Sequence, residues 1–153
     1  ALKNAWEILR PGGVLVVTEA PNRLTYFDWH TSLIPFFHML PLDLQLEYCI
    51  HSPRSVFSDT VRKSLKQGGH DAAIETLVRW GQSVSFHDFE IALGKDFNSF
   101  VVADGSHPLI ARVKPTKEKI GEKALNDYID EQNLKVHPAF TKGNIDVIFR
   151  KPE

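Results

Sequence analysis

The chain has 153 residues, of which 42% are hydrophobic and 24% charged, and its formal net charge at pH 7 is −1. This length and composition suit a single globular domain, and the near-neutral charge gives no basis for binding nucleic acid or an acidic membrane. The single cysteine, Cys49, has no partner for an internal disulfide, which is typical of a cytoplasmic protein. No apolar run approaches the ~18 residues of a membrane span.

The first part of the chain carries a helix pattern and then a strand pattern. Four apolar residues recur at the spacing of one helix face: Leu2, Ala5, Trp6 and Leu9. This spacing predicts an amphipathic helix, which ends before Pro11 because the residue before a proline avoids helical geometry. Residues 14–17 are an unbroken apolar run rich in β-branched side chains. Such a run favours a strand that is covered on both faces, as in a parallel sheet flanked by helices.

The middle of the chain predicts an irregular segment followed by helices. Residues 23–32 are rich in aromatic and polar side chains, which is typical of a functional loop at the edge of a sheet. A short apolar helix is expected over residues 33–40, and residues 42–50 fit either a strand or a helix. Helical spacing continues over residues 55–67, stops at a glycine pair, and resumes over residues 71–80.

One helix signature stands near the centre of the remaining sequence. Ser85 and Asp88 have the spacing of a capping box, which predicts a helix that stops at Gly94. Alternating side chains over residues 83–91 leave a strand as the competing interpretation.

The last third of the chain predicts extended segments around one helix. Extended pieces are expected over residues 97–103 and 109–113, and a helix is expected over residues 116–133. At the end, residues 134–140 are expected to pair with residues 145–149 in a hairpin, around a glycine-containing turn.

Two groups of motifs resemble one enzyme family. The sequence LRPGG at residues 9–13, between a predicted helix and an apolar strand, resembles the turn before the fifth strand in class I S-adenosylmethionine-dependent methyltransferases. A branch of that family carries elements similar to three stretches of this chain: NRL at residues 22–24, DWHT at residues 28–31, and Pro35 with LP at residues 40–41. The SFHDFE sequence at residues 85–90 resembles a later element of the same branch, with Asp88 in place of a glutamate.

The resemblance implies a fold and an activity. The implied fold is α/β: the C-terminal part of a Rossmann-like methyltransferase sheet, with helices and a terminal antiparallel hairpin at residues 134–150. Residues 23–54 are implied to form an insertion or lid on the substrate side. The implied reaction transfers a methyl group from the cofactor S-adenosylmethionine to a small-molecule or glycan-like acceptor, at an oxygen atom.

The family's cofactor signature is missing from this sequence. That signature is a strand that ends in a glycine-rich turn, and no G-x-G turn follows a predicted strand here. The chain also begins inside a predicted helix, without a capping residue before Leu2. We therefore expect residues 1–153 to form one incomplete methyltransferase domain, with the cofactor site largely upstream of Ala1.

A base for the acceptor hydroxyl is expected among the histidines, because imidazole titrates near neutral pH. His30 is the first candidate, and nearby Asp28 is expected to fix its tautomer if the loop turns back. The alternative is that His30 holds the loop through hydrogen bonds to the backbone. His87 is the second candidate, and its alternative is a residue in a first helical turn, either on the surface or packed under the lid. His38, among aromatic neighbours, is expected to be structural.

Three further residues are candidates for binding substrate, together with Asp28. Glu19 and Asn22 follow the predicted strand at the end where ligands bind in α/β sheets. The alternative for Glu19 is a carboxylate that hydrogen-bonds the backbone of the following turn, and the alternative for Asn22 is a turn-forming side chain. Arg23 is a candidate for holding an anionic group of the substrate, or it lies on the surface. The histidine and cysteine spacings typical of metal sites do not occur, so no metal is expected.

The alternative function is a non-catalytic half-domain. Without neighbouring strands, residues 14–17 would expose an edge and apolar faces, which favours self-association. The chain is then expected to complete a partner chain, to pair with the missing N-terminal half, or to form a homo-oligomer.

Overall fold

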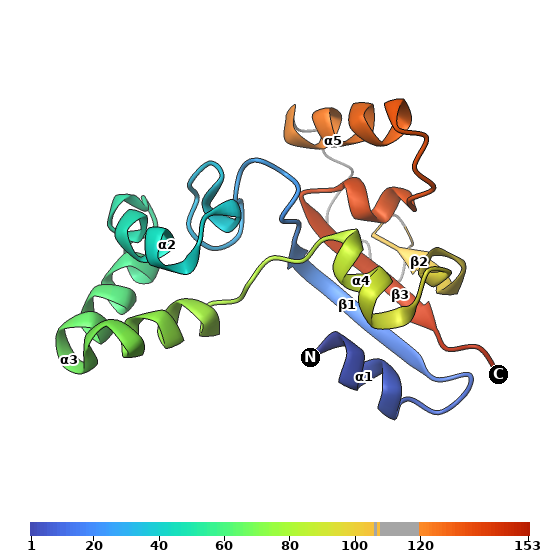
Figure 1. Cartoon of the computed structure of the whole chain (residues 1–153), viewed down its shortest axis with the longest axis horizontal. Coiled ribbons are helices and arrows are strands. Elements are labelled where there is room, and N and C mark those ends of the chain that lie inside the picture. Colours follow the sequence, from blue (N-terminus) through green and yellow to red (C-terminus); the bar gives the residue numbers. More distant parts are fainter. Residues whose placement is uncertain (106, 108–119) are drawn as a thin grey trace. The chain divides into compact units, whose positions relative to one another are not determined.

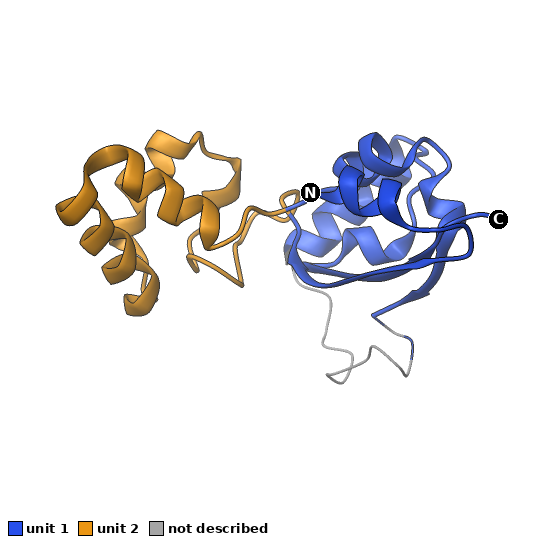
Figure 2. Ribbon diagram, turned by 90° about the horizontal axis from the view of Figure 1, so that it is seen from below, with its two compact units in different colours: residues 1–22, 84–153 blue, residues 23–83 orange. Residues whose placement is uncertain are grey.

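The computed structural model describes residues 1–105, 107 and 120–153 and shows a mixed α/β protein, as predicted (Figure 1). The described chain divides into two compact units (Figure 2): residues 1–22 and 84–153 form unit 1, and residues 23–83 form unit 2. Unit 2 begins at the residue predicted for the lid but extends to residue 83 instead of residue 54. Its role as a lid stays a prediction.

Unit 1 is built on a three-stranded antiparallel sheet. Its strands are β1 (Val14–Pro21), β2 (Val101–Asp104) and β3 (Asn144–Arg150), and β3 lies between the other two. β1 confirms the predicted strand, but the prediction that both of its faces are covered is wrong. Val14 and Val16 are 44% and 57% exposed, and among the described strands β1 pairs with β3 alone. The apolar run therefore forms an edge strand, antiparallel to its neighbour.

The predicted hairpin at residues 134–150 is wrong. Its first arm contains a 3₁₀ helix, η4 (Pro138–Thr141), and its second arm is β3, which pairs with β1 and β2. Pro138 explains the difference, because proline has no backbone N–H for a strand ladder and its fixed φ suits the first turn of a helix. The His137 side chain caps this turn by accepting a hydrogen bond from Ala139 N at 3.2 Å.

The core of unit 1 lies between the sheet and two helices. The inward side chains of β3 are fully buried: Ile145, Val147 and Phe149. Helix α1 (Leu2–Ile8) contributes Trp6, whose ring stacks on Phe100 with the ring centres 5.5 Å apart. Helix α4 (Phe86–Leu93) contributes Phe89, whose ring centre lies 5.4 Å from that of Phe149. The capping box at the start of α4 is present, so the helix prediction is confirmed and the competing strand is wrong.

The remaining described elements of unit 1 are shorter than predicted. The extended segment expected at residues 97–103 divides into a 3₁₀ helix, η3 (Phe97–Phe100), and β2. The predicted helix at residues 116–133 is described as α5 (Ile120–Glu131). The first residues predicted for that helix, and the extended piece predicted at residues 109–113, lie outside the described residues.

Unit 2 is helical around a small apolar core. Its elements are η1 (Phe37–Met39), α2 (Leu42–Tyr48), η2 (Cys49–His51) and α3 (Ser55–Arg79). The helix predicted over residues 33–40 is reduced to η1, and the ambiguous residues 42–50 are helical. Helix α3 bends at Gly69, where φ is 75°, so the predicted break is confirmed. The buried core residues are Phe37, Leu46, Cys49, Phe57, Val61, Ala73 and Leu77. None of the described helices is long and apolar enough to cross a lipid bilayer.

Candidate functional site

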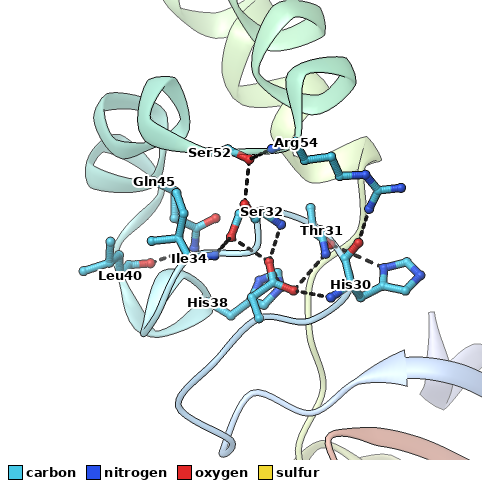
Figure 3. Close-up of polar contacts among 10 residues, drawn as sticks. His30, Thr31, Ser32, Ile34, His38, Leu40, Gln45, Ser52 and Arg54 are labelled. Atoms are coloured by element: carbon cyan, nitrogen blue, oxygen red, sulfur yellow. Dashed lines mark hydrogen bonds and ion pairs between the residues drawn. The ribbon is translucent and has the colours of Figure 1, made fainter.

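The polar loop that follows β1 in the sequence folds around the carboxylate of Asp28 (Figure 3). We call residues 26–38 the Asp28 loop. Asp28 Oδ1 accepts hydrogen bonds from the backbone N–H groups of His30 and Thr31, at 3.0 and 2.8 Å. Asp28 Oδ2 accepts hydrogen bonds from the backbone N–H and the hydroxyl of Ser32, at 2.5 and 2.8 Å. An aspartate folds the chain locally in this way because its short side chain reaches backbone N–H groups a few residues ahead.

A buried histidine completes the surroundings of Asp28. His38 Nε2 lies 3.2 Å from Asp28 Oδ2, and the two side chains are 6% and 1% exposed. The distance suits an ion pair, and among the residues that the structure describes His38 Nδ1 has no hydrogen-bond partner. Burial raises the pKa of Asp28, but the contacts with His38, Thr31 and Ser32 lower it by more, so that this pKa lies well below its ordinary value of 3.8. Asp28 is therefore ionised at neutral pH.

His30 presents its ring to solvent from a backbone that is held on both sides. Its N–H donates to Asp28, and its carbonyl oxygen accepts from the guanidinium of Arg54. Arg54 is also fixed, since its guanidinium carbon lies 5.4 Å from the centre of the Trp80 ring. The His30 ring is exposed, with Nδ1 at 3.5 Å from the hydroxyl of Thr31. The predicted contact between Asp28 and this ring is wrong, because the carboxylate accepts from the backbone N–H of His30 instead.

The two candidates at the end of β1 make structural contacts. Glu19 has a left-handed backbone conformation with φ of 55°, and its N–H donates to Asp146 Oδ1 at 2.6 Å. Asn22 is buried, and its side-chain amide donates to the carbonyl oxygens of Phe140 and Lys142, at 2.7 and 2.9 Å. Both contacts are structural but differ from the expected alternatives, because Glu19 bonds here through its backbone N–H and Asn22 reaches a distant segment and not a local turn.

The remaining two candidates lie in different units. Arg23, in unit 2, donates from Nη2 to the carbonyl oxygen of Ser83 at 2.7 Å, and this contact joins the two ends of the unit. His87, in unit 1, is exposed in the first turn of α4, and its ring stacks on Phe86 with the ring centres 3.9 Å apart. This is the surface position expected as the alternative for His87. Of the predicted site residues, Asp28 and His30 come together in one loop.

Three residues of this site are not singled out by the sequence as functional: His38, Ser52 and Arg54. Ser52 Oγ donates to the carbonyl oxygen of Ser32 at 2.6 Å and accepts from Arg54 N at 3.1 Å. No spacing rule connects these residues with Asp28, because they come from separate turns of the chain. Within the described residues, no three histidine, cysteine or carboxylate side chains gather in a way that could hold a metal ion.

Comparison with protein-family models, curated proteins and solved structures found no match to this chain.

Proposed function

We propose that this chain is the C-terminal part of a class I S-adenosylmethionine-dependent methyltransferase. Its acceptor is a small molecule or a glycan that is methylated at oxygen, and His30 is the base that removes the hydroxyl proton. S-adenosylmethionine supplies the methyl group as an electrophile. The described strands are not followed by a glycine-rich turn of the G-x-G type, so the residues of this chain do not by themselves fit the cofactor. We assign the cofactor site to another part of the methyltransferase fold.

The exposed edge of β1 is the observation that carries this proposal. Val14 and Val16 are exposed, although valine side chains are usually buried in folded proteins. On its second edge, β1 has no partner among the described strands. The apolar run at residues 14–17 makes β1 a poor end for a sheet, because an exposed apolar edge offers a template for aggregation. Such a strand suits the interior of a larger sheet, which is the fifth-strand position that the LRPGG resemblance implies.

The geometry of the LRPGG turn supports the same proposal. Gly12 has φ of 71°, and a Cβ on Gly13 would lie 2.7 Å from the carbonyl oxygen of Arg10. Both positions require glycine, because a side chain would be strained at the first and would clash at the second. Lys151 Nζ donates to the carbonyl oxygen of Trp6 at 2.9 Å, which satisfies one of the free carbonyl groups at the end of α1. The turn thus leads directly from a helix into the strand before the polar loop.

His30 suits the role of base because its ring is accessible and its backbone is fixed. The ring is exposed, while the N–H and the carbonyl oxygen on either side are both hydrogen-bonded. A fixed backbone reduces the freedom that is lost when the base meets its substrate. An imidazole also accepts protons near neutral pH, as a base for a hydroxyl must.

The same edge of β1 favours a second candidate function, a non-catalytic half-domain that completes a partner chain or self-associates. An edge strand of this kind pairs readily with a strand from another chain. The two functions differ in their need for the cofactor. A methyltransferase must bind S-adenosylmethionine, whereas a protein completed by a non-catalytic half-domain need not bind it.

Calorimetric titration with S-adenosylmethionine separates the two functions. We expect no binding by the 153-residue chain and clear binding by the complete gene product. Binding by neither protein would exclude the methyltransferase and leave the half-domain. Binding by the 153-residue chain alone would mean that the cofactor pocket is built from residues that we assign to the acceptor.

A further inference from the structure

Two residues with a strained backbone lie in the Asp28 loop. Leu33 and Phe36 have left-handed conformations, with φ of 57° and 60°, which are unfavourable for bulky side chains. Phe36 is nevertheless 54% exposed. Packing does not account for this strain, because an exposed ring gains little from the burial of apolar surface. Backbone strain of this kind is concentrated at ligand-binding sites, where a fixed loop conformation is useful.

Four aromatic rings of the loop contact one another in a row, in the order Phe36, Tyr26, Phe27 and Trp29. The two arms of the loop are joined by a hydrogen bond from Phe36 N to Tyr26 O and by a strand-like bridge between Phe27 and Pro35. The ring centres of Tyr26 and Phe36 are 5.7 Å apart, and those of Phe27 and Trp29 are 4.3 Å apart. Trp29 is 50% exposed, so the rings at both ends of this row, Trp29 and Phe36, face solvent.

The loop presents no exposed charge to a ligand. Asp28 is its only acidic or basic residue apart from the histidines, and this carboxylate is buried under the hydrogen bonds that it accepts. His38 is buried as well, so the exposed polar side chain next to Trp29 is that of His30. The cationic guanidinium of Arg54 beside the loop is engaged by the carbonyl oxygen of His30 and the face of the Trp80 ring, so the loop's own exposed side chains favour a neutral ligand. A flat neutral ring would stack on the exposed aromatic rings and would offer a hydroxyl to His30.

We infer that the Asp28 loop is a binding surface for a neutral ring that carries a hydroxyl group. Trp29 and Phe36 contact the apolar face of the ring, and His30 hydrogen-bonds the hydroxyl. A sugar pyranose and a phenol share this chemistry. The inference rests on the proposed function in one respect, since it makes this ring the methyl acceptor.

An NMR titration of the chain with three probes tests the inference. The probes are methyl β-glucopyranoside, phenol and glycerol, of which the last is a polyol without a ring. We expect at least one ring compound to shift the signals of the Trp29 indole and the Phe36 ring, and glycerol to leave them unchanged. Tighter binding of the glucopyranoside would identify the ligand as a sugar, and tighter binding of phenol would identify it as a phenol. An equal response to glycerol, or no response to either ring compound, overturns the inference.

Two variants connect the binding with the aromatic rings. Trp29→Ala should weaken binding of the ring by about tenfold or more. Tyr128→Ala removes a similarly exposed ring from α5 and should leave binding unchanged. Phe36→Gly should weaken binding while the urea midpoint of unfolding stays the same or rises, because glycine adopts φ of 60° without strain. A lower midpoint with unchanged binding would assign Phe36 to packing and contradict the inference.

These experiments need no cofactor, so they fail or succeed independently of the proposed function. If the chain binds neither ring compound but the complete gene product binds S-adenosylmethionine, the ring site is wrong and the methyltransferase stands. If the chain binds a ring compound but the gene product does not bind S-adenosylmethionine, the ring site stands and the methyl transfer is wrong.

Discussion

Replacement of Asp28 by asparagine is expected to destabilise unit 2, because this carboxylate is the centre of the loop contacts. Asparagine keeps one acceptor oxygen, so the N–H groups of His30 and Thr31 retain a partner. The second oxygen becomes an amide NH₂, which does not accept from the N–H of Ser32 and brings no charge to the contact with His38. Breaking a buried charged contact costs about 3 to 5 kcal/mol, and we expect a loss of this size at neutral pH.

The cost of this substitution should depend on pH. The pKa of Asp28 in the folded chain lies below the ordinary value of 3.8, so the unfolded chain binds a proton first as the pH falls. The carboxylate therefore contributes its full stability above about pH 5, and the contribution is lost as the pH falls through the folded-state pKa. Asparagine has no such proton uptake. The difference in stability between the two proteins should shrink by about 1 kcal/mol from about pH 7 to about pH 3, and it should shrink further at still lower pH.

Amide hydrogen exchange measures the opening of unit 2 by itself. The reporters are Val61 and Leu77, two buried residues of α3. Asp59→Asn is the matched control, because its carboxylate is exposed on the same helix and should contribute less than about 0.5 kcal/mol. The role assigned to Asp28 would be refuted by a loss below about 1 kcal/mol at neutral pH, or by a difference that does not shrink on acidification.

Three further substitutions have expected outcomes. Gly69→Ala places a side chain at φ of 75° and should lower the free energy of unfolding in urea by about 1 to 2 kcal/mol. Ser85→Ala removes the capping box of α4 and should cost about 1 kcal/mol in the same measurement, whereas no change would deny the cap a role in stability. Val16→Lys puts a charge on the exposed face of β1 and should reduce self-association in sedimentation experiments, while Ile91→Lys, on the exposed side of α4, should not.

The sequence predicted those elements whose cause is local. Pro11 ends a helix through a contact with its own neighbour, and Gly69 allows a bend that no other residue adopts as easily. Ser85 and Asp88 form a capping box within a single turn. Each of these signals acts over a few residues, so no knowledge of the tertiary structure was needed.

Strand pairing was predicted poorly because it depends on residues far apart in the chain. The apolar run in β1 resembles a buried parallel strand, but its observed partner is β3, at the other end of the chain and antiparallel. The predicted terminal hairpin failed for a related reason. Pro138 starts a 3₁₀ turn in one arm, and the other arm pairs with β1 and β2.

The candidate site was located by its sequence motif, but its contacts were not. The pattern of Asp28 and His30 predicted a polar loop in which the two residues are close. In the folded turn the backbone N–H of His30, and not its ring, meets the carboxylate. The contact between Asp28 and His38 was missed because the two residues come from separate turns of the loop and no spacing rule connects them.

Methyl transfer by the complete gene product is the measurement that tests the proposed function most directly. With labelled S-adenosylmethionine and a hydroxylated ring compound, we expect a labelled methyl ether. We also expect that His30→Ala lowers turnover by about tenfold or more without changing cofactor affinity, and that His87→Ala retains turnover. A gene product that methylates no hydroxyl, or a His30→Ala variant with unchanged turnover, would contradict the account.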